Sequence, residues 1–124
     1  DTALGPERSE LVILRAAYRM GSAYEWAHHV SRARKLGMAD ERIAAMCEMP
    51  EGLDGLIARA VDSLFENKRL SLEEEQRLSD AIGRPAVFDL IATVGFYSVL
   101  GYLLMTYETP IDHGVAEEMA AAPS

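Results

Sequence analysis

The chain has 124 residues, a length for which we expect one domain, over residues 1–124, with a buried core. Hydrophobic residues make up 49% and charged residues 26%, which excludes disorder as the main description. The net charge of -8 and the isoelectric point near 4.8 argue against a nucleic-acid partner, because a phosphate-binding surface needs clustered Lys and Arg.

The single cysteine, Cys47, excludes an intramolecular disulfide and two-cysteine redox chemistry within one chain. No secretion signal opens the sequence. We therefore expect a reducing compartment and a cytoplasmic location. Because the chain begins at Asp1 without an initiator Met, we also expect it to be a processed or trimmed form of a longer protein.

Three helices are predicted in the first part of the chain. An apolar stripe predicts a helix over residues 6–20. Ser22 is placed to cap a second helix, over 22–37. A short third helix is expected over 40–47, before Pro50.

The middle of the chain predicts two more helices. Apolar residues at the i, i+3, i+4 spacing of a core-facing stripe occupy residues 53–65. Ser71 and Glu74 form the capping box of the next helix, over 71–82. No segment shows strand alternation, and the Ala-rich tail from Ala116 is expected to fray. With one further helix, described next, the predicted fold is an all-α bundle of about six helices.

The sixth predicted helix, over 85–108, contains 18 consecutive uncharged residues, 90–107. This length just reaches the threshold for a membrane span. Acidic residues follow it, beginning with Glu108, and no nearby Lys or Arg anchors it, so we favour the centre of a helical domain or of an oligomer over a membrane. Gly95 and Gly101 permit close helix approach, either within the subunit or between subunits.

The segment from Ser22 to His29 is the strongest candidate for chemistry. At about 100° per residue, Ser22, Glu25 and His29 fall within a sector of about 60°, so all three can face one pocket. A Glu and a His at this spacing are often only a solvated helical pair. Tyr24 and Trp26 flank the carboxylate with aromatic groups, which favours a proton-transfer site.

A metal site is not expected in this segment. His28 and His29 are adjacent, so on a helix they point about 100° apart and do not readily share one ion. No third convergent ligand is visible, and His28 is expected to face solvent.

The sequence resembles the carboxymuconolactone decarboxylase family over about residues 9–112. The resemblance is carried by Glu-Leu-Val-Ile-Leu-Arg at 10–15, by Tyr-Glu-Trp with His29 in the segment just described, by Gly37 followed by Asp-Glu-Arg-Ile-Ala, and by residues 88–97. It implies an all-α, alkylhydroperoxidase D-like fold, assembly into trimers or hexamers, and no metal or organic cofactor. Members are usually longer at the N-terminus, which fits a missing leader segment here.

Redox relatives in this family carry a Glu, then Cys-x-x-Cys, then a His four residues beyond the second Cys. When His29 is aligned with that His, Ser22 and Glu25 fall on the two Cys positions and Glu10 falls on the upstream Glu. Both redox sulfurs are therefore absent, and Cys47 lies outside the motif. An alkylhydroperoxidase-type oxidoreductase is accordingly the less favoured alternative.

The resemblance implies a lyase or isomerase that uses Glu/His proton transfer on a small unsaturated organic acid or lactone. The expected catalytic residues are His29, Glu25 and Glu10, and the expected substrate-binding residues are Arg15, Ser22 and Trp26. The expected partners are this small molecule and further copies of the chain, with no nucleic acid and no membrane. Two alternatives stay open: a non-catalytic oligomeric protein of the same fold that binds a small ligand, and a small membrane-associated helical protein.

Overall fold

The computed structural model of the chain describes residues 2–121, and every regular element in that range is helical. The predicted all-α class is therefore confirmed. In chain order the elements are α1 (Pro6–Met20), α2 (Ala23–Lys35), α3 (Asp40–Ala44), the 3-10 helix η1 (Ala45–Cys47), α4 (Gly52–Asn67), α5 (Leu72–Ile82), α6 (Arg84–Thr106) and α7 (His113–Ala120).

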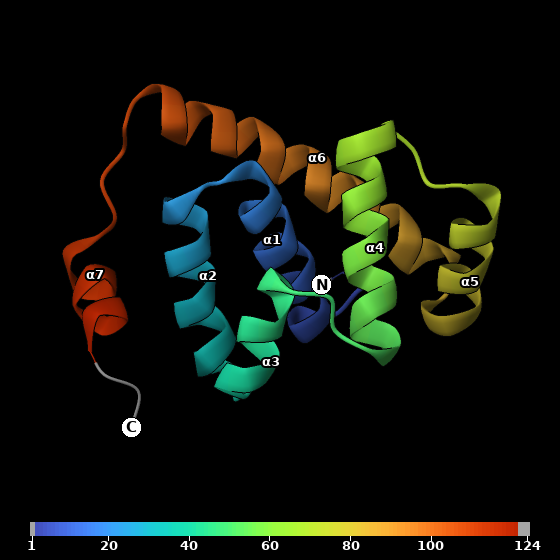
Figure 1. The fold of residues 1–124 in the computed structure, drawn as a ribbon, viewed down its shortest axis with the longest axis horizontal. Coiled ribbons are helices and arrows are strands. Elements are labelled where there is room, and N and C mark those ends of the chain that lie inside the picture. The colour runs from blue at the N-terminus through green and yellow to red at the C-terminus, as the bar shows by residue number, and fades with distance from the viewer. Residues whose placement is uncertain (1, 122–124) are drawn as a thin grey trace.

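The six predicted helices correspond to α1 through α6, with η1 continuing α3. The seventh helix, α7, was not predicted, and the expectation that the tail frays from Ala116 is wrong as far as Ala120. Helix α7 lies beside α2 (Figure 1), where Glu118 accepts hydrogen bonds from Ser31 Oγ at 2.7 Å and Arg34 Nη1 at 2.8 Å. Residues 122–124 of the tail lie outside the described residues.

Helix α1 is the central element, and α2, α4 and α6 all pack against it (Figure 1). Residues 10–17 of α1 are all buried, so the helix is enclosed on every side over about two turns. This segment includes two charged residues, Glu10 and Arg15, and each must find a polar partner inside the protein.

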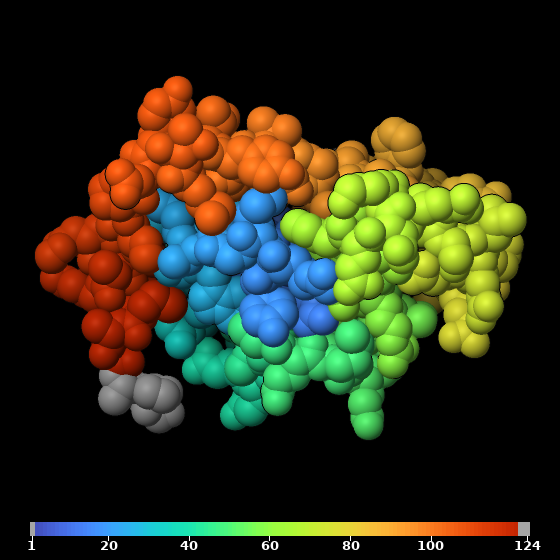
Figure 2. Space-filling view, turned by 45° about the horizontal axis from the view of Figure 1, so that its top comes forward, coloured from blue at the N-terminus to red at the C-terminus, as the bar shows by residue number. Residues whose placement is uncertain are grey.

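Helix α6 spans 23 residues and lies across α1 (Figure 1). It is the one helix of the described residues that is long and apolar enough to cross a membrane, with a mean hydropathy of 1.7, yet only 22% of its most apolar window is buried. The orange atoms of α6 form a ridge along one edge of the molecule (Figure 2). Of the two places predicted for this helix, the centre of the single chain is occupied by α1, and the centre of an oligomer stays a prediction.

The outward face of α6 is apolar and uncovered. Its exposed large side chains are Phe88, Ile91, Phe96, Val99, Tyr102, Leu103 and Met105, and they are followed by Tyr107 directly after the helix. An exposed apolar surface of this kind is characteristic of a contact with another macromolecule or with lipid. Gly95 lies in this exposed face, whereas Gly101 is buried against the same chain, so the two glycines serve different contacts.

The buried guanidinium of Arg15 joins α1 to α4 and η1. Its Nε and Nη2 donate to the two carboxylate oxygens of Asp62 at 2.9 and 2.8 Å, while Nη1 donates to the carbonyl oxygens of Met46, at 3.0 Å, and Glu48. Burial alone would raise the pKa of Asp62, but the hydrogen bonds and charges of Arg15 and Arg19 together outweigh it and hold that pKa below its usual value. Arg15 is thus a structural anchor of the fold.

We expect Arg15→Met to lower the free energy of unfolding by about 3 kcal/mol, because it leaves a mostly buried carboxylate and two carbonyl oxygens without their donor. Arg19, 3.1 Å from Asp62 Oδ1, compensates only partly because it is more exposed. Urea denaturation followed by circular dichroism measures the change. Arg84→Met is the matched control, since Arg84 pairs with Glu75 at the surface; equal destabilisation by both variants would contradict the anchoring role.

Candidate acid/base site

A cavity of about 190 Å³ lies between α2 and α6. Helix α6 supplies an aromatic and apolar wall made of Tyr97, Leu100 and Leu104. Helix α2 supplies the polar wall, whose residues are Tyr24, Glu25, His28, His29 and Arg32. The cavity therefore combines an acid, two imidazoles and a guanidinium with a surface on which an apolar ligand can pack.

His29 is held in place by Glu10 from the neighbouring helix. Its Nδ1 lies 2.6 Å from Glu10 Oε1, and both side chains are buried. Because a carboxylate only accepts hydrogen bonds, Nδ1 carries the proton and Nε2 remains available to a ligand. The edge-to-face contact with Tyr97, at 5.2 Å between ring centroids, further fixes the ring. The structure thus brings Glu10 and His29 together as the sequence predicted.

Glu25 has a different environment, since no hydrogen-bond partner reaches its Oε1 within the described part of the chain. The residue is only 3% exposed, and this burial raises its pKa to about 7. Helix α6 closes over it at Gly101, where a Cβ atom would lie 3.3 Å from Glu25 Oε2. Near neutral pH, Glu25 is therefore an acid that can be either protonated or ionised, and it faces the cavity.

The predicted substrate-binding residues do not meet at this cavity. Ser22 is buried at the N-cap of α2, where its Oγ accepts a hydrogen bond from the Glu25 N–H at 3.2 Å. Trp26 lines a separate shallow groove and packs against the core. Arg15 is engaged by Asp62 and by backbone carbonyls, so it does not line the cavity.

Cys47 shares that shallow groove with Trp26 and lies outside the cavity of His29. Burial raises the pKa of its thiol, which makes it a poorer source of thiolate than an ordinary cysteine. The position of Cys47 thus gives no support to thiol redox chemistry.

His28 was expected to face solvent, but the structure places it half-buried in the cavity wall. Its ring stacks on Tyr24, its Nδ1 lies 2.9 Å from the Tyr24 carbonyl oxygen, and its Nε2 lies 3.2 Å from Asp112 Oδ2. Although His28 and His29 line one cavity, no group of three or more His, Cys, Asp or Glu among residues 2–121 is placed to hold a metal ion.

Arg32 and Tyr97 are two of the cavity residues that were not predicted as site residues. A local signal existed for Arg32, because Glu25, His29 and Arg32 follow the i, i+4, i+7 spacing of one helical face. No comparable signal existed for Tyr97, which lies about 70 residues further along the chain and reaches the cavity only through the packing of α6.

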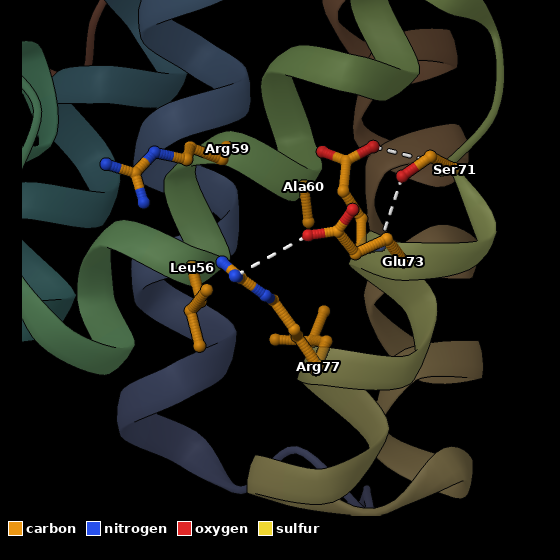
Figure 3. A pocket seen from close by; sticks show the side chains of 8 residues that line it. Leu56, Arg59, Ala60, Ser71, Glu73 and Arg77 are labelled. Carbon is orange, nitrogen blue, oxygen red and sulfur yellow. Dashed lines mark hydrogen bonds and ion pairs between the residues drawn. The ribbon is translucent and has the colours of Figure 1, made fainter.

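A second cavity, of about 230 Å³, lies between α4 and α5 (Figure 3). Two pairs of its polar groups satisfy one another: Arg77 pairs with Glu73 at 3.5 Å, and Ser71 exchanges capping hydrogen bonds with Glu74. Glu74 is half-buried, and the other polar groups of this cavity are exposed. We therefore assign the chemistry to the cavity between α2 and α6, which contains a buried acid without a partner.

Fold and site together define a helical protein with a buried acid/base cavity. The model of the carboxymuconolactone decarboxylase family matches residues 1–63, half of the sequence, and the chain belongs to this family, whose fold is all-α and alkylhydroperoxidase D-like. The matched segment contains Glu10, Glu25 and His29 and ends within α4, so α6 lies beyond it. No curated protein and no solved structure matches the chain.

We expect Glu25→Gln to stabilise the protein more at pH 8 than at pH 5, by about 2–3 kcal/mol. The pKa of Glu25 is about 7 in the folded state against 4.5 for an ordinary Glu, so the folded state retains a proton that the unfolded state releases. The contribution of Glu25 to stability is therefore full below about pH 4.5 and declines as the pH rises to about 7. Gln cannot ionise and avoids this loss.

Urea denaturation at the two pH values measures the effect, with Glu41→Gln as the control, because Glu41 is exposed on α3. A pH-independent difference between wild type and Glu25→Gln would show that Glu25 has an ordinary pKa.

Proposed function

We propose that the chain is a cofactor-independent lyase or isomerase that transfers a proton to or from carbon in a small unsaturated organic acid or lactone. The observation that supports this proposal is the pairing of two kinds of acid/base group in one cavity. Glu25 has a pKa of about 7 and no hydrogen-bond partner at Oε1, and His29 presents a free Nε2 because Glu10 holds Nδ1.

These groups suit the requirements of decarboxylation of an unsaturated lactone acid. The bond between the carboxylate carbon and its neighbour breaks, carbon dioxide leaves, and the electron pair spreads into an extended enolate. Product forms when a carbon of that enolate takes up a proton. The neutral carboxyl of Glu25 is suited to donate this proton, and His29 Nε2 is suited to carry a proton between the cavity and water.

Isomerisation requires the same groups in a different order. A base first removes a proton from carbon, and an acid returns one to another carbon, so Glu25 and His29 would exchange roles within one turnover. Membership of the family favours decarboxylation or a related reaction, and the cavity volume of about 190 Å³ restricts the substrate to a small molecule.

We expect His29→Ala to abolish turnover and Glu10→Gln to lower it by about 10²- to 10⁴-fold, because the first removes a proton carrier and the second removes the group that orients it. The measurement is a screen of small unsaturated acids and lactones for carbon dioxide release, combined with deuterium incorporation from heavy water. His113→Ala is the control, since that imidazole is 90% exposed on α7.

Turnover at the wild-type rate in His29→Ala would defeat the mechanism. Ligand binding without any turnover in the wild type would favour the non-catalytic binding protein. Peroxide consumption with a dithiol reductant tests the redox alternative. Substantial activity would show that the protein is a peroxidase although it lacks both cysteines of the redox motif.

We also propose that the chain assembles into a homo-oligomer, a trimer or a hexamer, through the outward face of α6. This face is apolar from Phe88 to Tyr107 and carries no charge that would oppose contact with a second copy, apart from the half-buried Asp89 near its start. Asp89 Oδ2 already accepts a hydrogen bond from the Ala3 N–H at 2.6 Å. Association of copies would cover the surface that one chain leaves exposed to water.

We expect the double variant Phe96→Glu, Val99→Glu to dissociate the assembly into subunits of 13.6 kDa, because two carboxylates would have to be buried in an apolar contact. Light scattering coupled to gel filtration without detergent measures the mass. Leu72→Glu is the control, since Leu72 is 81% exposed and belongs to α5 rather than to the outward face of α6. A monomeric wild type would contradict the proposal, and a wild type that stays soluble only in detergent would favour the membrane alternative.

A further inference from the structure

Arg32 is the one Lys or Arg among the residues that line the cavity between α2 and α6. It follows His29 by three residues and Glu25 by seven, so the three side chains share one face of α2. Seven residues of helix rise by about 10 Å, which places Glu25 and Arg32 toward opposite ends of the cavity with His29 between them. The cavity is therefore polarised, with its acid at one end and its fixed cation at the other.

The surroundings of the Arg32 guanidinium differ from those of three other arginines of the chain. Arg15, Arg34 and Arg42 are each bound by a carboxylate of the same chain. For Arg32, no carboxylate within residues 2–121 lies at ion-pair distance. Its N–H groups can therefore donate hydrogen bonds to water or to a ligand in the cavity.

The charge of Arg32 acts inside the cavity. Burial raises the pKa of the Tyr97 phenol, and the positive charge of Arg32 opposes that rise. Tyr97 belongs to the wall supplied by α6, opposite α2. The field of Arg32 thus extends across the space that a ligand would fill.

We propose that Arg32 is a specificity-determining residue of this cavity: its guanidinium binds the carboxylate of a small organic anion, whose apolar part lies against Leu100 and Leu104. A guanidinium matches a carboxylate with two parallel hydrogen bonds, a geometry that an uncharged ligand cannot fully reproduce. The assignment rests on the proposed function, because it takes the same cavity to be the substrate site. It gives Arg32 the role that the sequence analysis expected of Arg15.

Crotonate and crotonamide test this role, because they have nearly the same shape and differ in charge. We expect the wild type to bind crotonate at least fivefold more tightly than crotonamide at low salt, with dissociation constants measured by saturation-transfer NMR titration. Arg32→Met keeps the apolar stem and removes the charge, so crotonate affinity should fall at least fivefold and the preference should disappear. Lys35→Met removes the same charge from an exposed position of α2 that does not line the cavity, so the preference should persist.

Three results would overturn the assignment: no crotonate binding by the wild type at millimolar concentration, equal affinity of the wild type for both probes, or an unchanged preference in Arg32→Met. Thermal denaturation verifies that both variants are folded. The same titration on His29→Ala separates this proposal from the proposed function. A variant that loses turnover but keeps the crotonate preference supports both proposals, and a wild type that shows the preference without any turnover overturns only the enzymatic proposal.

Discussion

The enclosure of α1 is the constraint on which the rest of the structure depends. Residues 10–17 are buried on all sides, and they include the charged side chains of Glu10 and Arg15. A buried charge without a partner costs several kcal/mol, so both residues must be paired. They are five positions apart, about 140° around the helix, and therefore need partners on different sides. His29 on α2 and Asp62 on α4 meet this need, so polar pairing as well as apolar packing fixes both helices around α1.

The contact between Glu10 and His29 consequently has both a structural role and a chemical role. It satisfies a buried carboxylate of α1, and it also leaves Nε2 of the imidazole directed to a ligand. Glu25 presents the opposite case, because its burial is not compensated at Oε1. A folded protein avoids this cost when it can, and perturbed acids cluster at functional sites. The two carboxyls of this site thus have separate tasks, one holding the imidazole and one exchanging a proton.

Features encoded within one or two turns could be predicted from the sequence. The capping box of Ser71 and Glu74 and the N-cap at Ser22 both occur in the structure as expected. Features that depend on contacts between residues far apart in the sequence could not be predicted. Helix α7 owes its place to hydrogen bonds that Glu118 accepts from α2, more than 80 residues earlier in the chain. Sequence periodicity likewise did not show which arginine, Arg15 or Arg32, faces the cavity, because both lie on amphipathic helices and only packing distinguishes them.

The position of α6 links two surfaces of the protein. Its inner side closes the cavity, and at Gly101 its backbone lies directly over the carboxyl of Glu25. Its outer side is the apolar face that one chain leaves uncovered. The pKa of Glu25 is raised by burial, so it depends on how closely α6 is seated. Any contact that holds the outer face of α6 would keep water from Glu25, whereas displacement of α6 would return the pKa of that acid toward its ordinary value. The exposed apolar face and the burial of Glu25 therefore both depend on the position of this one helix.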